Sequence, residues 1–245
     1  MAELLFGVHP VRAALRYDPG RVQEAWLERG RRDARLARLR QQLQSLDIPL
    51  HDVGRRELDT LTEGAVHQGV AARYAGLPPR DDDDLGALLA GLDAEPLLLV
   101  LDQVQDPHNL GACLRTADAA GVHGVVAPRD RAAGLTPAVF KVASGAAQSV
   151  PFFQVTNLAR SLQQLRERGV WTVGAAADAA TVHHAADLTG PLALVVGAED
   201  TGLRRLTRER CDLLVALPMH GQVESLNVSV AAGVLVYEAL RQRRG

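Results

Sequence analysis

The stretch that decides the fold is Leu97–Arg115, which reads LLLVLDQVQDPHNLGACLR. Its first five residues are apolar without alternation, which is typical of a strand buried on both faces of a sheet. From Leu110 to Ala120 the apolar residues recur at helical spacing. A buried strand followed by a helix is the unit that builds parallel sheets, so this stretch predicts an α/β fold.

The alternation of strand and helix continues to the end of the chain. Short runs rich in Val and Leu predict further strands at Val122–Ala127, Val170–Ala175, Leu192–Val196 and Leu213–Leu217. Helices are predicted at Leu110–Ala120, Pro137–Ala147, Leu158–Arg168 and about Ser225–Gln242. Apolar strands of this kind predict a largely parallel sheet with helices on both faces.

The first part of the chain predicts a smaller, mixed domain. Short strands are expected at Val22–Leu27, Pro49–Val53 and Val66–Tyr74. A helix is expected at Asp33–Leu46, where Leu36, Leu39, Leu43 and Leu46 recur at helical spacing. The arginines that flank this apolar stripe are Arg31, Arg32, Arg35, Arg38 and Arg40. They fit either a basic face for RNA phosphates or a surface that serves solubility alone.

The clearest break in the chain is Gly76–Arg80, whose two prolines block a helix and a central strand. Four aspartates follow at Asp81–Asp84, and their like charges repel one another. We therefore expect a domain at residues 1–75, a linker at 76–95 with a short helix at Leu85–Leu92, and a domain at 96–245. A metal site at the aspartates is disfavoured against a solvated linker, because consecutive carboxylates on a flexible segment rarely converge on one ion.

The composition indicates a folded protein. The 245 residues are 47% hydrophobic and 23% charged, which argues against disorder. No run approaches the ~18 apolar residues of a membrane span, and the first residues lack a secretory pattern. The two cysteines, Cys113 and Cys211, are too few for a disulfide framework, so we expect a cytoplasmic protein. The net charge of −2 divides into +3 over residues 1–80 and −5 over residues 81–245.

Polar residues follow three of the predicted strands of the second domain. Asn109 and Arg115 follow the first, Glu199 lies within Gly197–Gly202, and Pro218–Ala231 follows the last strand. Ligands of parallel α/β sheets bind at the carboxyl ends of strands, so these residues are candidates for one site. Taken singly, each has a structural reading: Asn109 and Ser225 as helix N-caps, Glu199 or Asp200 as a cap of the next turn, and Arg115 in a surface salt bridge.

Several common sites are absent from the sequence. There is no G-x-G-x-x-G after a strand, no phosphate-binding P-loop and no G-x-S-x-G, which disfavours dinucleotide, nucleotide and serine-hydrolase chemistry. His183 and His184 with Asp187 suggest a metal only weakly, since adjacent side chains point apart, and we predict no metal site. Cys113 lies on an apolar helix face and is expected to be buried and inert.

Together the three segments resemble a known family. Their motifs are N-x-G-x-x-x-R at Asn109–Arg115, G-x-E-x-x-G at Gly197–Gly202 and P-M-x-G-x-x-E-S-L-N-V-S-V-A at Pro218–Ala231. They resemble those of the SpoU/TrmH branch of the SPOUT superfamily, which are S-adenosylmethionine-dependent RNA ribose 2′-O-methyltransferases. Phe6–Val11 and His67–Gly69 are similar to the small L30e-like RNA-binding domain of the subgroup that methylates guanosine in bacterial 23S rRNA.

The resemblance implies an α/β SPOUT domain with a trefoil knot, preceded by the L30e-like domain, and a homodimer whose site is completed across the interface. It implies that S-adenosylmethionine is held largely by backbone, at Gly197, Leu217, Met219 and Leu226. Asn109 and Arg115 would act on the target ribose and Glu199 would help to position them. Ser225 and Asn227 would shape the pocket, Ser225 on the cofactor side and Asn227 on the catalytic side.

The activity that the resemblance implies is methylation of a guanosine ribose of 23S rRNA in the peptidyl-transferase region. Methylation of tRNA or of another rRNA nucleotide, and a non-catalytic RNA-binding assembly factor, stay open as alternatives. The family gives the removal of the hydroxyl proton to Arg115, yet a guanidinium holds its own proton very strongly. Either the site greatly weakens the hold of the Arg115 guanidinium on its proton, or Arg115 orients the hydroxyl and a phosphate while another acceptor takes the proton.

Overall fold

The computed structural model describes residues 3–77 and 80–244. The two prolines of the break after Leu77 lie outside the described residues. The chain divides into two compact units, one of Met1–Pro78 with Leu135–Ser149 and one of Pro79–Gly134 with Val150–Gly245. The domain limits that the sequence suggested stay a prediction, and each unit is described below by itself.

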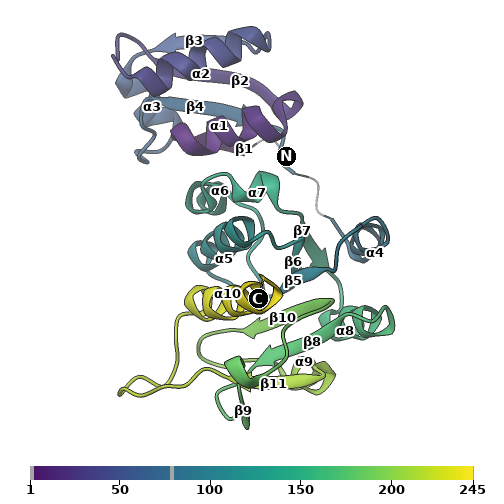
Figure 1. The fold of residues 1–245 in the computed structure, drawn as a ribbon. Coiled ribbons are helices and arrows are strands. Elements are labelled where there is room, and N and C mark those ends of the chain that lie inside the picture. The colour runs from purple at the N-terminus through teal and green to yellow at the C-terminus, as the bar shows by residue number, and fades with distance from the viewer. Residues whose placement is uncertain (1–2, 78–79, 245) are drawn as a thin grey trace. The chain divides into compact units, whose positions relative to one another are not determined.

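In its described part, the first unit is built on a four-stranded sheet with the order β1-β4-β2-β3 (Figure 1). Strand β2 pairs parallel with β3 and antiparallel with β4, which pairs antiparallel with β1. Its elements are β1 (Glu3–Phe6), α1 (Val8–Tyr17), β2 (Val22–Glu28), α2 (Ala34–Ser45), β3 (Leu50–Val53), α3 (Arg55–Leu61), β4 (Val70–Tyr74), α6 (Pro137–Ala143) and α7 (Ala146–Ser149).

Helix α2 confirms the predicted leucine stripe. Leu36, Leu39 and Leu43 are buried, whereas Leu46 follows the end of the helix and is exposed. The single helix predicted at Pro137–Ala147 is wrong, because the chain breaks between α6 and α7. Ser144 and Gly145 both have positive φ there, at 53° and 108°, which ends α6 and starts a new turn.

The second unit confirms the predicted parallel α/β fold. Its described residues form a seven-stranded sheet with the order β7-β6-β5-β10-β8-β11-β9, and every pairing is parallel. The strands are β5 (Leu97–Asp102), β6 (Gly124–Pro128), β7 (Phe152–Val155), β8 (Trp171–Ala175), β9 (Thr181–Val182), β10 (Leu192–Gly197) and β11 (Leu213–Ala216). The helices are α4 (Asp82–Ala90), α5 (Pro107–Ala120), α8 (Leu158–Glu167), α9 (Arg205–Arg210) and α10 (Val228–Arg244).

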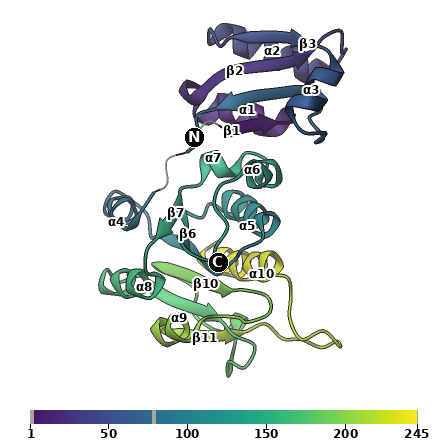
Figure 2. The ribbon, with the colours of Figure 1, turned by 180° about the vertical axis from the view of Figure 1, so that it is seen from behind.

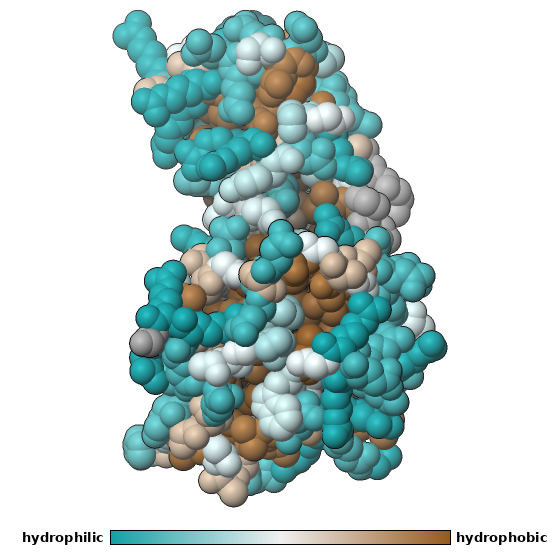
Figure 3. Space-filling model, turned by 45° about the vertical axis from the view of Figure 1, so that its right-hand side comes forward, coloured by the Kyte–Doolittle hydropathy of each residue, from teal (hydrophilic) through white to brown (hydrophobic). Residues whose placement is uncertain are grey.

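Helices cover both faces of this sheet, with α5 and α10 on one face and α4, α8 and α9 on the other (Figures 1 and 2). A space-filling view shows hydrophilic residues over most of one side of the molecule, with hydrophobic residues in patches between them (Figure 3). No helix in residues 3–77 and 80–244 has the length and apolar composition needed to cross a membrane. The strand order does not establish the trefoil knot, which stays a prediction.

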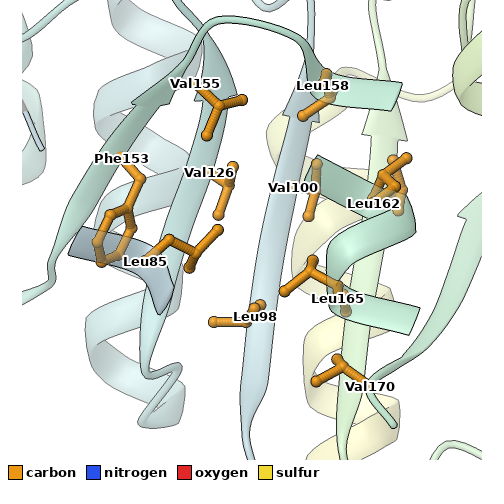
Figure 4. Packing of buried hydrophobic residues seen from close by; sticks show 12 residues of the cluster. Leu85, Leu98, Val100, Val126, Phe153, Val155, Leu158, Leu162, Leu165 and Val170 are labelled. Atoms are coloured by element: carbon orange, nitrogen blue, oxygen red, sulfur yellow. The ribbon is translucent and has the colours of Figure 1, made fainter. Parts of the chain in front are cut away.

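The core beneath α8 explains why the apolar runs become central strands. Leu98 and Val100 of β5 point to the same side as Val126 of β6, and Leu162 and Leu165 of α8 pack onto them (Figure 4). All five are buried. Full burial of such a side chain stabilises a fold by about 1.5–3 kcal/mol, so this layer holds the sheet edge that carries the loops described next.

The aspartates of the expected linker are part of a helix. The Asp81 side chain accepts hydrogen bonds from the backbone N–H groups of Asp83 and Asp84, and Asp84 accepts one from the Asp81 N–H, which makes a capping box for α4. Asp82 accepts a hydrogen bond of 2.5 Å from the hydroxyl of Ser161 on α8. Asp81, Asp83 and Asp84 are exposed, as expected of a solvated acidic run, and the run also caps α4 and attaches it to α8.

Candidate active site

A cleft of about 520 Å³ lies at the carboxyl ends of β8, β10 and β11, which are neighbours in the sheet. This is the edge at which parallel α/β sheets bind ligands. It is lined by Ala175–Asp178 from the end of β8 onward, by Val196–Leu203 from the end of β10 onward, and by Leu217 and Met219 after β11; Arg208, Glu224–Leu226, Val228 and Ala231 complete it.

The five residues that the sequence suggested for the cofactor all line this one cleft. They are Gly197, Leu217, Met219, Ser225 and Leu226. Gly197 belongs to the second motif and Met219, Ser225 and Leu226 to the third, which Leu217 directly precedes; α9 and β11 separate these motifs in the chain. The structure therefore brings these residues together, and their role as cofactor ligands stays a prediction.

The loop after β10 closes tightly on itself. Ala198 and Gly202 form an isolated antiparallel bridge, and the Gly202 N–H donates to the Ala198 carbonyl at 2.8 Å. A Cβ atom at Gly197 would overlap the carbonyl carbon of Gly202 and the amide nitrogen of Leu203. Gly202 itself has a φ of 63°, in the left-handed region. Both glycines of the motif are needed for the shape of this loop.

A buried carboxylate fixes the far end of the same loop. Asp102 ends β5, pairs in register with Gly197, and is fully buried. Its carboxylate accepts hydrogen bonds from the backbone N–H of Arg204 at 2.9 Å and from the Arg204 Nε at 2.7 Å. Asp102 thus holds the loop at both of its ends, through the sheet at Gly197 and through its side chain at Arg204.

Three side chains from the three motifs meet in a polar cluster of Asn109, Glu199 and Asn227. The Asn109 Nδ2 donates to Glu199 Oε1 at 3.1 Å, and the Asn227 Nδ2 donates to the same oxygen and to Asn109 Oδ1, the latter at 2.9 Å. Glu199 Oε1 also accepts from the backbone N–H of Val228 at 3.2 Å. Residues 118 positions apart in the sequence are in direct contact here.

Helix ends position the two asparagines. Asp106, and not Asn109, is the N-cap of α5: it accepts from the His108 N–H at 2.8 Å, and Pro107 starts the helix, so Asn109 projects from the first turn. The prediction of α10 from Ser225 is also wrong. The helix begins at Val228, and Asn227 Oδ1 accepts from the Ser229 N–H at 3.0 Å and the Ser229 hydroxyl at 2.6 Å.

Arg115 is not brought into the cluster. It lies on α5 six residues after Asn109, which places it about 9 Å further along the helix and on a different face. Its side chain is exposed, and it makes no hydrogen bond or ion pair with any residue in the described part of the chain. The surface salt bridge considered from the sequence is therefore not formed within those residues either.

The structure also places two charged residues on the cleft that the sequence did not single out. Arg208 of α9 forms a two-pronged ion pair with Asp178, with its two terminal nitrogens 2.8 and 2.9 Å from the two carboxylate oxygens. The Arg208 guanidinium lowers the pKa of Asp178, and that carboxylate raises the pKa of Arg208. Asp178 follows three alanines at the end of β8, so its position after a strand was the one signal available.

The other reactive groups lie elsewhere. His183 and His184 meet edge to face with ring centroids 5.2 Å apart, and Asp187 accepts hydrogen bonds from Thr189 instead of facing them. Among the residues with described positions, no group of three or more His, Cys, Asp or Glu side chains could hold a metal ion. Cys113 is buried on α5, which confirms the expected burial, and burial raises its pKa to about 12, which disfavours the reactive thiolate.

Two family models match the chain in the order of its two predicted domains. The RNA 2′-O ribose methyltransferase substrate-binding model matches residues 4–80, and the SpoU rRNA methylase model matches residues 96–237. The second match contains the three motifs and all of the residues that line the cleft.

Relatives match over nearly the full length. The chain is 52% identical over 242 residues to the 23S rRNA (guanosine-2′-O-)-methyltransferase RlmB of Shewanella oneidensis, a match that covers 99% of this chain and 98% of the relative. It is 51% identical over 243 residues to the protein of the same name from Escherichia coli strain K12, with 99% and 100% covered.

Solved structures agree with these matches. The SpoU methyltransferase AviRb from Streptomyces viridochromogenes superposes with a TM-score of 0.83 at 26% identity, over 99% of this chain and 90% of that one. The same protein in complex with its cofactor AdoMet gives a TM-score of 0.81 at 26% identity, over 98% and 90%. With this fold, these motifs and relatives at more than half identity, the chain belongs to the SpoU rRNA methylase family.

Proposed function

We propose that this protein transfers a methyl group from S-adenosylmethionine to the ribose 2′-hydroxyl of a guanosine in 23S rRNA. The full-length relatives carry this activity in their names, and AviRb binds AdoMet. The observation that carries the proposal is the polar cluster of Asn109, Glu199 and Asn227, because Glu199 belongs to the loop that lines the cleft. The cluster thus places the side chains that would contact the RNA beside the cleft that would hold the cofactor.

The cleft fits the cofactor in size and in chemistry. Its volume of about 520 Å³ lies in the range of about 300–1,000 Å³ that small-molecule sites occupy. Leu203, Leu217, Met219 and Leu226 offer apolar surface for an adenine ring, and the closed Gly197–Gly202 loop offers backbone groups. When bound, S-adenosylmethionine supplies an electrophilic methyl group on a sulfonium. The carboxylates along the cleft suit that positive charge.

The cluster is proposed to orient the ribose. Glu199 Oε1 is occupied by hydrogen bonds from Asn109, Asn227 and Val228, whereas no residue of the described ranges donates to Oε2. Since Glu199 is exposed, Oε2 is free to accept a hydrogen bond from a ribose hydroxyl. Holding the hydroxyl in line with the methyl group supplies much of the rate, because good orientation alone is worth about 7–11 kcal/mol.

Arg115 is proposed to complete the site from a second copy of the chain. Its side chain is exposed and unpaired among the described residues of its own chain, yet its motif is intact. Val230, Val234 and Tyr237 form an exposed apolar stripe on α10, and α10 packs beside α5, which carries Arg115. A homodimer that covers this stripe would also bring Arg115 close to its partner. Its planar guanidinium suits a phosphate and the target hydroxyl, while another acceptor takes the proton.

The alternatives differ in substrate or in activity. Methylation of tRNA or of another rRNA nucleotide uses the same cluster, but the full-length relatives favour guanosine in 23S rRNA. A non-catalytic assembly factor is disfavoured because Asn109, Glu199 and Asn227 are all present and hydrogen-bonded together. The peptidyl-transferase region as the target and the cytoplasm as the location are part of the proposal.

The test is a methyl-transfer assay on defined RNA. The full chain is incubated with labelled S-adenosylmethionine and unmodified 23S rRNA, 16S rRNA or total tRNA, and 2′-O-methyl groups are mapped by resistance to alkaline cleavage. We expect one methylated guanosine in 23S rRNA. Label in tRNA alone would select the alternative substrate, and cofactor binding without transfer to any RNA, with ribosomal precursor particles included, would select the assembly factor.

A further inference from the structure

The charges around the cleft are strongly uneven. Four carboxylates line it, from Asp178, Glu199, Asp200 and Glu224. Among the described residues that line the cleft, Arg208 is the one cation. The cleft therefore attracts positive groups along most of its surface and offers one place to an anion.

Arg208 is held ready for such an anion. Its Nη1 lies 2.8 Å from Asp178 Oδ1 and its Nη2 lies 2.9 Å from Oδ2, so the guanidinium is fixed in a plane by the loop after β8. The ion pair uses one N–H of each terminal nitrogen, and a guanidinium has five N–H groups. Side-chain exposures of 39% for Arg208 and 69% for Asp178 leave the remaining N–H groups and carboxylate lone pairs within reach of a ligand.

The proposed cofactor carries the matching charges at one end. Its methionyl part ends in an α-carboxylate and an α-ammonium group, and the carboxylate is its one anion. That carboxylate is repelled by Glu199, Asp200 and Glu224 and attracted by Arg208 alone. The ammonium group is attracted by Asp178, which stands beside Arg208.

We infer that Arg208 binds the α-carboxylate of S-adenosylmethionine and that Asp178 binds its α-ammonium group. This inference rests on the proposed function, because it requires S-adenosylmethionine as the ligand of the cleft. Two opposite charges that are already paired and fixed by α9 and the β8 loop recognise a zwitterion with little reorganisation. The resemblance to the family had suggested recognition largely by backbone groups, so these two side chains add a polar anchor.

The opposing interpretation is that the ion pair only ties the β8 loop to α9. In that case its loss would loosen the whole cleft and weaken every ligand to the same degree. The two interpretations therefore differ in how the loss depends on the ligand, and ligands that lack one charged group separate them.

The experiment measures dissociation constants by calorimetry on the full chain, for the wild type, Arg208→Gln and Asp178→Asn. The ligands are S-adenosylmethionine, its decarboxylated form, which lacks the α-carboxylate, and methylthioadenosine, which lacks the whole amino acid. We expect Arg208→Gln to weaken S-adenosylmethionine by about 10-fold or more, since a charged hydrogen bond is lost. The same variant should change the affinity for decarboxylated S-adenosylmethionine by less than about 2-fold, because this ligand has no carboxylate for Arg208 to bind.

Asp178→Asn should weaken both ligands that carry the ammonium group and leave methylthioadenosine unchanged. Arg205→Gln is the matched control, because Arg205 also lies on α9 in an exposed ion pair, with Glu209, but does not line the cleft. Arg208→Lys, which keeps the charge and loses the planar fork, should bind S-adenosylmethionine with intermediate affinity. Unfolding midpoints of all variants show whether each is folded.

Equal losses for S-adenosylmethionine and its decarboxylated form in both Arg208 variants would overturn the inference in favour of the structural role. Unchanged affinities would overturn it as well. If the wild type binds S-adenosylmethionine and methylates 23S rRNA while these results appear, the inference alone fails. If the wild type binds none of the three ligands, the proposed function fails with it.

Discussion

At Glu199 a single carboxylate oxygen joins all three motifs. Oε1 accepts hydrogen bonds from Asn109, Asn227 and the backbone of Val228, so one side chain fixes the first turns of α5 and α10 against the loop after β10. A hydrogen bond to a charged group contributes about 1.5–3 kcal/mol when it is protected from water, and less at an exposed residue such as this one. Its main effect is therefore orientation of the two asparagines.

Replacing Glu199 by Gln should abolish most of the methyl transfer while leaving the fold intact. The amide keeps an acceptor oxygen for the asparagines but loses the charge and one acceptor for the ribose hydroxyl. We expect the single-turnover rate on 23S rRNA to fall at least about 100-fold, the usual cost of losing one preorganised polar contact at a reacting centre. S-adenosylmethionine affinity should change less than about 3-fold, which corresponds to well under 1 kcal/mol.

The control is Asp200→Asn, which removes the neighbouring charge in the same loop. Asp200 accepts no hydrogen bond from Asn109 or Asn227. If both variants slowed transfer equally, the net charge of the loop would explain the effect, and Glu199 would lose its proposed role.

Glu238 near the end of α10 gives a stability prediction that depends on pH. It accepts hydrogen bonds from Arg241 at 2.9 and 2.8 Å and from Gln242 at 2.8 Å, and these hold its pKa at about 2, below its ordinary value of 4.5. Because the folded pKa is lowered, the stabilisation is complete above pH 4.5 and is lost as the pH falls toward 2.

We expect Glu238→Gln to lower the free energy of unfolding by up to about 1 kcal/mol at pH 7, as for other exposed ion pairs. The difference from the wild type should shrink between pH 4.5 and pH 3, measured by urea unfolding at each pH. Asp93→Asn is the control, since the Asp93 side chain has no hydrogen bond or ion pair among the described residues. A difference that is constant with pH would refute this account of Glu238.

At the scale of elements, the long apolar runs were predictable and the short or polar elements were not. Strands β5 and β10 were recognised because each is a run of buried, mostly aliphatic residues, and β11 because its four residues are all aliphatic. Helix α1 was missed because Pro10 lies within it and because its first N–H, from Val8, is bound by Gln68, which is 60 residues away. Strand β9 has two residues and α9 is mostly charged, so neither has a spacing of apolar residues that predicts a strand or a helix.

The residues of the candidate site were likewise predictable only in part. The rule that ligands bind at strand ends, together with the resemblance, led to Asn109, Glu199 and Asn227, which meet in the structure. The same reasoning could not find Arg208, because an arginine in a polar helix looks like any surface residue until the helix is folded against the β8 loop. Nor could it place Arg115, whose proposed partner belongs to another copy of the chain.

The loop after β10 gives a prediction for a whole element. In Gly197→Ala, the new methyl group would overlap the backbone of Gly202 and Leu203, so the loop must open. We expect S-adenosylmethionine affinity to fall by at least about 10-fold, because the loop provides much of the cleft wall. Calorimetry measures the affinity, and the unfolding midpoint reports the accompanying strain.

Gly134→Ala serves as its control, because the nearest atom to a Cβ there is 3.7 Å away, an ordinary contact distance. This substitution should leave both the affinity and the unfolding midpoint unchanged. Tight cofactor binding by Gly197→Ala would mean that the loop is not part of the cofactor site.

For the whole molecule, positive and negative charge are unevenly divided between the first part of the chain and the rest. Residues 1–80 are net positive and the rest of the chain is net negative. Several arginines around α2 are neutralised by carboxylates, as Arg31 is by Glu28 and Arg40 is by Asp52. Arg32 and Arg38 have no such partner among the described residues, which leaves them free to meet phosphates.

The double variant Arg32→Gln/Arg38→Gln tests whether this basic face binds RNA or serves solubility alone. If it binds RNA, the affinity for 23S rRNA should fall, and the slope of log affinity against log salt should decrease by up to about 1.4–1.8, or about 0.7–0.9 for each phosphate contact. S-adenosylmethionine affinity should not change. Filter binding at several salt concentrations measures both quantities.

The control is a second double variant, Arg55→Gln/Arg56→Gln on α3, which lies in the same unit and removes the same number of positive charges. Neither arginine has an ion pair among the described residues. An unchanged salt slope in the α2 variant would assign its arginines to solubility. Equal reductions in both variants would assign RNA binding to the charge of the whole unit and not to the α2 face.

The proposed homodimer predicts complementation between two inactive variants. Arg115→Ala and Glu199→Gln should each be inactive alone, with the first still binding S-adenosylmethionine. If Arg115 acts on the cleft of its partner, mixing and re-equilibrating the two variants creates dimers with one intact site. Random pairing of equal amounts should then restore roughly a quarter of the wild-type activity in a symmetric dimer.

An equal mixture that stays inactive although subunits have exchanged, as followed by a size-tagged copy in native electrophoresis, would mean that Arg115 acts within its own chain. Wild-type activity of Arg115→Ala alone would remove the residue from the mechanism altogether.

The cleft draws all of its walls from residues 175–231, which follow β5, β6 and β7 in the chain. During translation, therefore, a nascent polypeptide can pair β5, β6 and β7 before any pocket exists, because β10 joins β8 to them later. A ribosome that stalls or terminates ahead of β10 releases a product with three paired strands and no cleft, because residues 196–231 supply most of the cleft walls. Ligand retention is thus a quality check on full-length synthesis, and an immobilised adenosyl resin would separate finished copies of this protein from truncated ones.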